Sequence, residues 1–301
     1  MSPKFVNRGP LSDQHENSAS EGVAFIKKHN KTSTEMKING SIISILHTFT
    51  AYSAFILALI VGLKLHYLKI VKNEHYGYPD EWIPSVSATI GDRYPERNVF
   101  QISIALTCPF RLTLLILWFY TCKATALTKI APKSTKLPLV VFIVGFLRTI
   151  TAGIWVYITS SDDHDIHDVG MLLYMALTLP YMFTTISSSS NLTQLARTNT
   201  FESKKTTRYR KIVCFSFIIA IFPMLYWFIQ HKVNKVAGAY SIYAIYEWFL
   251  IIADVLFDAV TYYEFKLIDL SIQISPDNLK SEIPLSRIGP ALHETSSSRH
   301  D

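Results

Sequence analysis

The stretch Leu137-Pro-Leu-Val-Val-Phe-Ile-Val-Gly-Phe-Leu-Arg-Thr-Ile-Thr-Ala-Gly-Ile-Trp-Val-Tyr-Ile158 decides the fold class of this chain. Almost all of its residues are apolar, and it is as long as the ~20 residues that a helix needs to cross a ~30 Å hydrocarbon core. Backbone groups find no water inside a bilayer, so a run of this length is expected to be helical. Arg148 is its one charged residue. The stretch therefore predicts a membrane-spanning helix that buries a charge.

Five further blocks of the same kind lie before and after this one in the chain. The chain is 49% hydrophobic and 17% charged, whereas a soluble domain carries about 25% charged residues. The pattern predicts an all-α polytopic membrane protein, a bundle of six transmembrane helices. The predicted spans are roughly residues 42–63, 99–121, 137–158, 169–187, 212–230 and 239–263.

The parts of the chain outside the spans predict two tails and a structured loop. Residues 1–41 are polar and lack a short apolar run that ends in a cleavage site, so the first span is expected to act as a signal anchor. The cytosolic tails are residues 1–41 and 266–301, and their composition up to about Lys37 and from about Ser275 is typical of disordered segments. Residues 42–265 then form the transmembrane domain, with a structured luminal loop at 64–98.

The distribution of Lys and Arg predicts the orientation in the membrane. Outside the predicted spans, 20 of these residues fall on one side and 7 on the other. The positive-inside rule places both termini in the cytosol and the loops 64–98, 159–168 and 231–238 in the lumen. The net charge of +6 then indicates a cytosolic face that matches anionic lipid. No nucleic-acid partner is expected.

Five charged residues lie inside the predicted spans: Arg111, Arg148, Glu247, Asp254 and Asp258. Each costs about 2.5–3.5 kcal/mol on insertion scales, so each needs a partner. Helical spacing puts the three acids on one face of the sixth span. Depths estimated from the helical rise pair Arg148 with Glu247 and Arg111 with Asp254. Spans two, three and six are therefore expected to adjoin.

These charges allow two interpretations. One is an ion-pair network that fixes helix packing. The other is a polar cavity that holds a lipid headgroup, in which an arginine contacts phosphate and Pro109 opens the helix. His47 in the first span is expected to be packed and hydrogen-bonded. The candidate residues for headgroup binding are Arg111, Arg148, Glu247 and Asp254.

An acidic loop with two histidines, Ser160-Ser-Asp-Asp-His-Asp-Ile-His-Asp-Val-Gly170, separates the third and fourth spans. A histidine and a carboxylate can act as a general base and the group that orients it, so His167 and Asp168 are candidate catalytic residues. Aspartates also cap helix N-termini, and we favour that role for this loop. No zincin-like or phosphate-loop motif is present, and neither a metal nor a cofactor is predicted.

The loop after the first span carries a family resemblance. It reads Trp82-Ile-Pro-Ser-Val-Ser-Ala-Thr-Ile-Gly-Asp-Arg-Tyr-Pro-Glu-Arg-Asn-Val-Phe100. This stretch resembles the signature of the Frag/DRAM/Sfk group, and most closely the post-GPI-attachment-to-proteins factor 2 family. His167 and Gly170 also match a His and a Gly that open the family's fourth span. The residues that match the luminal signature are Pro84, Ser85, Ser87, Gly91, Asp92, Pro95, Glu96 and Arg97.

The resemblance implies a multi-pass protein of the Golgi membrane, and also of the endoplasmic reticulum membrane, that acts on GPI anchors after their attachment to protein. The implied step restores a saturated acyl chain to lyso-GPI, with the chain as transferase or obligatory subunit. Implied partners are GPI-anchored proteins, membrane lipid and other GPI-remodelling membrane proteins. Because no transferase motif is present, a non-enzymatic regulator remains the alternative, either a DRAM-like autophagy modulator or an Sfk-like regulator of lipid asymmetry.

Overall fold

The computed structural model describes residues 34–91, 93–126, 136–195, 200–266 and 268–274. The chain divides into two compact units, one of residues 39–269 and one of the residues before and after them. Strands β1 (Thr34–Asn39) and β2 (Asp269–Ile274) pair in a two-stranded sheet. Both strands alternate apolar with polar residues, a pattern that the sequence analysis did not use. The tail segments 1–33 and 275–301, predicted to be disordered, lie outside the described residues.

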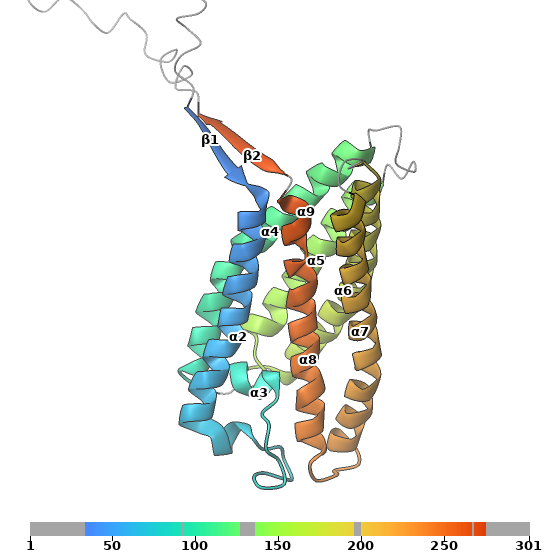
Figure 1. The fold of residues 1–301 in the computed structure, drawn as a ribbon. Helices are drawn as coiled ribbons and strands as arrows, with labels where there is room; N and C mark the ends of the chain where they lie inside the picture. Colours follow the sequence, from blue (N-terminus) through green and yellow to red (C-terminus); the bar gives the residue numbers. More distant parts are fainter. Residues whose placement is uncertain (1–33, 92, 127–135, 196–199, 267, 275–301) are drawn as a thin grey trace, which may run out of the picture. The chain divides into compact units, whose positions relative to one another are not determined.

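The unit of residues 39–269 is built from helices (Figure 1). The Asn39 side chain accepts a hydrogen bond from the backbone N–H of Ser41 at 3.1 Å, and this cap starts the first helix. The helices are α2 (Gly40–Ile70), α3 (Val86–Gly91), α4 (Glu96–Ala126), α5 (Leu137–Tyr157), α6 (His164–Leu195), α7 (Thr200–Lys232), α8 (Ala239–Ala259) and α9 (Thr261–Phe265).

Five of these helices are long and apolar enough to cross a membrane: α2, α4, α5, α6 and α7. The sixth predicted span corresponds to α8, whose 21 residues would cover ~30 Å. Helix α8 carries three acids within its apolar sequence, Glu247, Asp254 and Asp258, which are all buried. The predicted all-α polytopic membrane fold is therefore confirmed.

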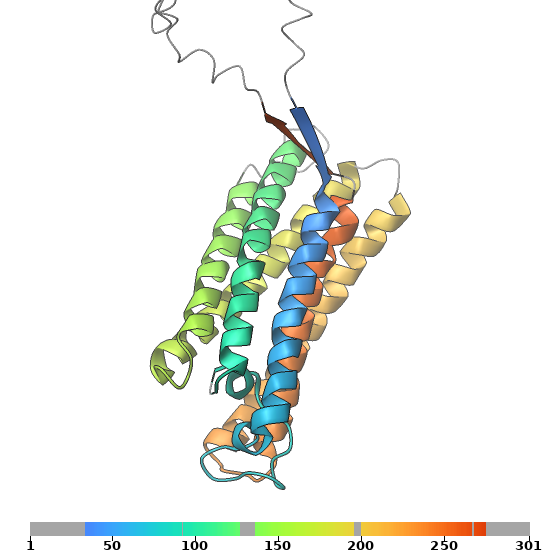
Figure 2. The same ribbon diagram turned by 90° about the vertical axis from the view of Figure 1, so that its left-hand side faces the viewer.

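Helix α8 packs beside both α2 and α7, and α9 also contacts α2 (Figures 1 and 2). Helix α4 lies against α2 and α5, and α6 joins α5 to α7. The acids of α8 consequently face other helices and not lipid tails. Prolines at 109, 180 and 223 lie inside α4, α6 and α7 without ending them, as membrane helices tolerate.

Two glycines allow α5 to approach its neighbours closely. A Cβ at Gly145 would lie 2.3 Å from a methyl carbon of Leu115 on α4. A Cβ at Gly170 on α6 would lie 2.7 Å from Cγ2 of Ile154. Small residues at such contacts are typical of helix packing in membranes, where close van der Waals contact replaces the hydrophobic driving force. The α4–α5–α6 contact therefore depends on these positions.

Candidate functional site

A buried carboxylate joins the segment between α2 and α4 (residues 71–95, the connecting segment) to the start of α8. Glu81 is fully buried and accepts hydrogen bonds from the backbone N–H groups of Gly238 at 3.1 Å and Ser241 at 2.8 Å, and from Ser241 Oγ at 2.7 Å. This role of Glu81 was not predicted from the sequence. One signal was available: α8 follows Gly238, which has no side chain, so its N-terminal cap must come from elsewhere.

The first half of the luminal signature is held by α8. Glu247 accepts hydrogen bonds from the Val86 N–H at 2.8 Å and from Ser87 Oγ at 3.3 Å. Ser85 Oγ accepts from the Ala88 N–H and from the Tyr240 hydroxyl, both at 3.0 Å. The carbonyl of Pro84 accepts from the Trp248 indole at 3.0 Å. Glu247 therefore holds α3, and its predicted ion pair with Arg148 is wrong.

The second half of the signature joins the connecting segment to the acidic loop. Ser161 Oγ donates to the carbonyl of Gly91 at 3.0 Å. Arg97 Nη1 donates to Asp162 Oδ1 at 3.0 Å, and Glu96 is buried beside His66, with 2.8 Å between Oε1 and Nδ1. Pro95 precedes Glu96 as an exposed residue, and Asp92 lies outside the described residues.

The Arg97–Asp162 pair is resistant to acid. The hydrogen bonds from Arg97 and then from Thr159 lower the pKa of Asp162 to about 2, from an ordinary value of 3.8. A depressed carboxyl pKa favours the folded state above the ordinary value, and this contribution is lost only as the pH falls through about 2. The pair therefore stays ionised at any pH well above 2.

Inside the bundle, Arg148 is the centre of a charged cluster with Arg111, Asp254 and Asp258 (the arginine cluster). Arg148 is 1% exposed and forms an ion pair with Asp254, while its Nη1 lies 3.6 Å from Asp258 Oδ2. Arg111 Nη2 lies 3.8 Å from the same oxygen of Asp258. The predicted pairing of Arg111 with Asp254 is therefore wrong, although spans two, three and six do meet through these side chains.

The predicted pairs were wrong because they took the membrane surface to lie at the start of α8. Its first turns pack against the connecting segment, where Glu81 and Glu247 bind backbone N–H groups. Glu247 is therefore level with α3, and Asp254 reaches the level of Arg148. The remaining donors of Arg148 are satisfied by Thr178 Oγ1 and the Tyr174 hydroxyl, both at 2.9 Å.

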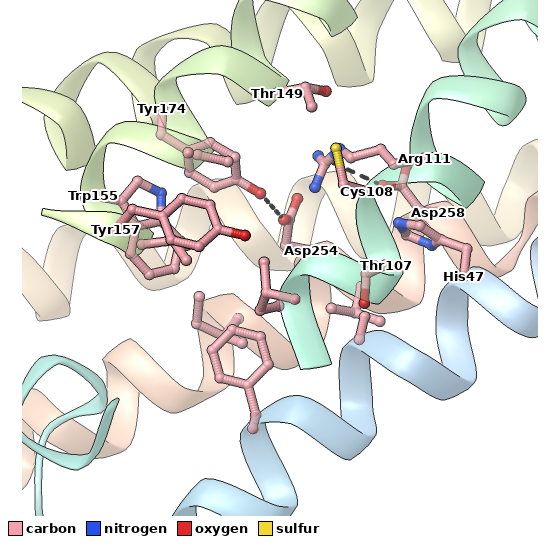
Figure 3. A pocket seen from close by; sticks show the side chains of 18 residues that line it. His47, Thr107, Cys108, Arg111, Thr149, Trp155, Tyr157, Tyr174, Asp254 and Asp258 are labelled. Carbon is pink, nitrogen blue, oxygen red and sulfur yellow. Dashed lines mark hydrogen bonds and ion pairs between the residues drawn. The ribbon is translucent and has the colours of Figure 1, made fainter. Parts of the chain in front are cut away.

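Beside the arginine cluster lies a groove of about 110 Å³ between α2, α4, α5 and α8 (Figure 3). Arg111 and His47 line it. His47 is 2% exposed, and neither of its ring nitrogens has a hydrogen-bond partner among the described residues, which corrects the expectation that it is hydrogen-bonded. Cys108 is exposed at the groove, and a Cβ at Gly153 would meet open space. The groove thus opens sideways between α4 and α5.

The acidic loop, residues 160–170, caps α6 and also supplies residues that line a cavity. Asp163 Oδ1 accepts from the Ile166 N–H at 3.0 Å and so caps α6, as the capping interpretation predicted. His167 is not a cap. Its Nδ1 lies 2.9 Å from the carbonyl oxygen of Ile158. Since a carbonyl only accepts, Nδ1 carries the proton and Nε2 carries the lone pair.

His167 lines a cavity. His167 is 3% exposed, and its Nε2 has no partner among the described residues. The predicted His167–Asp168 pair is not formed, because Asp168 lies beside His164 with 3.4 Å between Oδ2 and Nε2. The cavity measures about 190 Å³ and we call it the histidine cavity. Its polar lining includes Lys72, Asn73, His75, Ser85, Ser87, His164, His167, Asp168, His231, Lys232 and Tyr240.

At the opposite end of the bundle, Arg210 is fully buried. It donates to Glu264 Oε1 at 3.1 Å, to the Phe257 carbonyl at 2.9 Å and to Thr261 Oγ1 at 2.8 Å. From sequence, Arg210 belongs to a basic run next to the fifth span and reads as a surface charge. Its partners are more than 45 residues away in the chain, so no local pattern shows them.

Comparison with known proteins places most of the chain in one family. Residues 39–268 match the Frag1/DRAM/Sfk1/Cwh43P N-terminal domain. Protein cwh43 of Schizosaccharomyces pombe is 42% identical over 81% of this chain, which spans only 23% of that relative's length. Acyltransferase PGAP2 of Xenopus tropicalis is 24% identical over 70% of this chain and 82% of its own.

A third relative, post-GPI attachment to proteins factor 2 of Drosophila melanogaster, is 22% identical over 61% of this chain and 70% of its own. No solved structure matches the chain. The matched domain extends from the cap of α2 to the residue before β2, so it contains every helix described above. The chain therefore belongs to the Frag1/DRAM/Sfk1/Cwh43 N-terminal domain family.

Proposed function

We propose that this chain is a GPI-anchor lipid-remodelling factor that acts after GPI attachment to protein. The proposed step restores a saturated acyl chain to lyso-GPI. Support comes from a relative named as an acyltransferase and from relatives named for the stage after GPI attachment. The proposed partners are GPI-anchored proteins, membrane lipid and other GPI-remodelling membrane proteins, in the Golgi membrane and also in the endoplasmic reticulum membrane.

One observation favours a catalytic role over that of an accessory subunit. The Ile158 carbonyl accepts from Nδ1 of His167, whose ring lines the histidine cavity and whose Nε2 is buried without a partner among the described residues. A general base needs this arrangement, in which one ring nitrogen is anchored and the other is free to take a proton. The sequence suggested that Asp168 orients His167. In the structure the backbone carbonyl of Ile158 orients it instead.

The proposed reaction uses an acyl ester or thioester as donor. The free hydroxyl of lyso-GPI gives its proton to His167 Nε2 while its oxygen attacks the acyl carbonyl carbon and forms a new C–O bond. The intermediate then collapses, and the bond from the acyl carbon to the donor's oxygen or sulfur breaks. The leaving alkoxide or thiolate takes the proton back from His167. The base is therefore regenerated, and no oxidant or reductant is needed.

We assign the arginine cluster to helix packing within this proposal. Arg148 and Asp254 satisfy each other, and Glu247 holds α3, so three of the four candidate headgroup ligands are already engaged. Arg111 lies 15 residues from the start of α4, a depth of ~22 Å. A phosphate in the luminal leaflet would lie much nearer the surface of the membrane. The ion-pair interpretation therefore fits these residues better than headgroup binding.

Lipid analysis of GPI-anchored proteins from cells that lack this chain tests the proposed function. We expect lyso-GPI to accumulate and the anchored proteins to be shed, because a single remaining chain holds the membrane weakly. Re-expression of the full chain should restore two-chain anchors. Unchanged anchors in the deletion cells would reject the proposal and favour a non-enzymatic regulator, DRAM-like or Sfk-like.

The proposal also requires a topology in which both termini are cytosolic and the histidine cavity faces the lumen. The luminal leaflet is the one that carries GPI lipids. We expect a cysteine at exposed Asp163 (Asp163→Cys) to be protected from an impermeant thiol reagent in sealed microsomes and to react after permeabilisation. Exposed Lys204→Cys, at the opposite end of the bundle, should react in both conditions. Labelling of Asp163→Cys in sealed microsomes would reverse the topology.

A further inference from the structure

A second, apolar cavity adjoins the histidine cavity inside the bundle. It measures about 60 Å³ and lies between α3, α5, α6, α7 and α8. Its wall is formed mainly by long apolar side chains. Those that belong to no other cavity described above are Met175, Phe217, Met224 and Leu250.

The apolar cavity shares part of its wall with the site of the proposed chemistry. Ser87, Met171 and Tyr243 line both it and the histidine cavity, so the two spaces are neighbours. Tyr243 and Asp254 mark the extent of the apolar cavity along α8. They lie 11 residues apart, which corresponds to ~16 Å.

The other end of the apolar cavity leads toward lipid. It shares Trp155, Tyr174, Ile251 and Asp254 with the groove, which opens sideways between α4 and α5. One side of this shared wall is apolar, formed by Trp155 and Ile251. The three spaces therefore succeed one another, from the polar cavity at the loop end, through an apolar space, to a groove open to lipid.

We propose that the apolar cavity holds the acyl chain during its transfer. The carbonyl carbon of the chain would lie in the histidine cavity, its first carbons between α6, α7 and α8, and its end in the groove. This inference rests on the proposed function. The order of the spaces matches an amphiphile, because polar groups need the polar cavity and methylene groups gain by leaving water for an apolar wall.

The same geometry accounts for a preference for saturated chains. A saturated chain can lie straight along α8 through the narrow apolar cavity. A cis double bond bends the chain, and a bend needs more room than a cavity of about 60 Å³ lined by Leu250 and Met175 offers. Closely packed interiors accept additional volume poorly. Chain selection would therefore occur at these two side chains.

Photo-crosslinking tests the occupant directly. Cells that express the full chain would be fed a palmitic acid analogue that carries a mid-chain diazirine and a terminal alkyne. We expect crosslinked peptides from the apolar cavity, at Met175 or Leu250. Crosslinks confined to lipid-facing residues such as Phe249 and Leu172 would overturn the inference, because those side chains are exposed on the outside of the same two helices.

Variants complete the test. Leu250→Trp should fill the cavity and lose both the crosslinks and the reacylated anchors, whereas Phe249→Trp on the lipid face of α8 should change neither. Leu250→Ala should widen the cavity and raise the share of unsaturated chains in the anchors. Misfolding of Leu250→Trp could not explain such a change in the Leu250→Ala variant. If the deletion accumulates lyso-GPI but both Leu250 variants give normal anchors, the inference fails and the proposed function stands. If the deletion leaves anchors unchanged, the proposed function itself fails.

Discussion

Replacing Arg148 by leucine is expected to lower the free energy of unfolding by about 3–5 kcal/mol, because removal of one partner from a buried ion pair leaves the other charge unpaired. In this chain the unpaired group would be Asp254, which Arg148 neutralises deep in the bundle. The variant also lacks the hydrogen bonds that Arg148 donates to Thr178 and Tyr174. The variant should show a strongly reduced steady-state level and a lower melting temperature in detergent.

The double variant Arg148→Leu with Asp254→Leu separates the ion pair from other effects. It should recover part of the lost stability, since neither charge is then left without its partner. Arg111→Leu is the matched control, because Arg111 contacts Asp258 only at 3.8 Å and lies 5.9 Å from the centre of the Tyr174 ring. A double variant no more stable than Arg148→Leu would show that packing of the long arginine side chain, and not its charge, dominates.

His167→Asn is expected to abolish lipid reacylation while leaving the protein level and localisation normal. The asparagine amide can approximate the position of Nδ1 and keep the hydrogen bond to the Ile158 carbonyl, but it has no group in the place of Nε2. The variant therefore removes the base and preserves the anchor. The measurement is the ratio of lyso-GPI to two-chain GPI in cells that express the variant in place of the original chain.

His164→Asn is the matched control for His167→Asn. His164 belongs to the same loop and also lines the histidine cavity, but it is exposed and pairs with Asp168. It should keep most of the activity. If His167→Asn is as active as the original chain while His167→Ala is not, the histidine serves only to hold the end of α5, and the general-base role is wrong.

The fold class could be read from the sequence because hydrophobic length is a local property. Each apolar block is as long as the bilayer is thick, and helices occupy each block. The helices extend beyond the blocks, as α7 does by starting at Thr200, because backbone hydrogen bonds continue into the interface where polar residues are tolerated. The strand pair was missed, since its alternating pattern is short and its partners are more than 200 residues apart.

The candidate site could be predicted only in part. The acids of α8 were found because a charge in an apolar block is conspicuous, and their common face follows from helical spacing. Their partners were assigned wrongly, because the assignment needed the relative heights of helices and not only their order. Glu81, Tyr174 and Arg210 look ordinary in the sequence. Their roles arise from contacts with distant residues, which hydropathy and spacing do not show.

The attachment of the connecting segment to α8 has a consequence for the order of synthesis. The connecting segment is translated after the first span, but its partners Ser241 and Glu247 belong to the last of the long helices. Until that helix is inserted, Glu81 lacks the Ser241 donors and Val86 lacks the Glu247 acceptor for its N–H. This end of the bundle therefore closes only when nearly the whole membrane domain has been made. A chain halted before α8 would leave these groups open to the quality-control machinery that recognises unfinished membrane proteins.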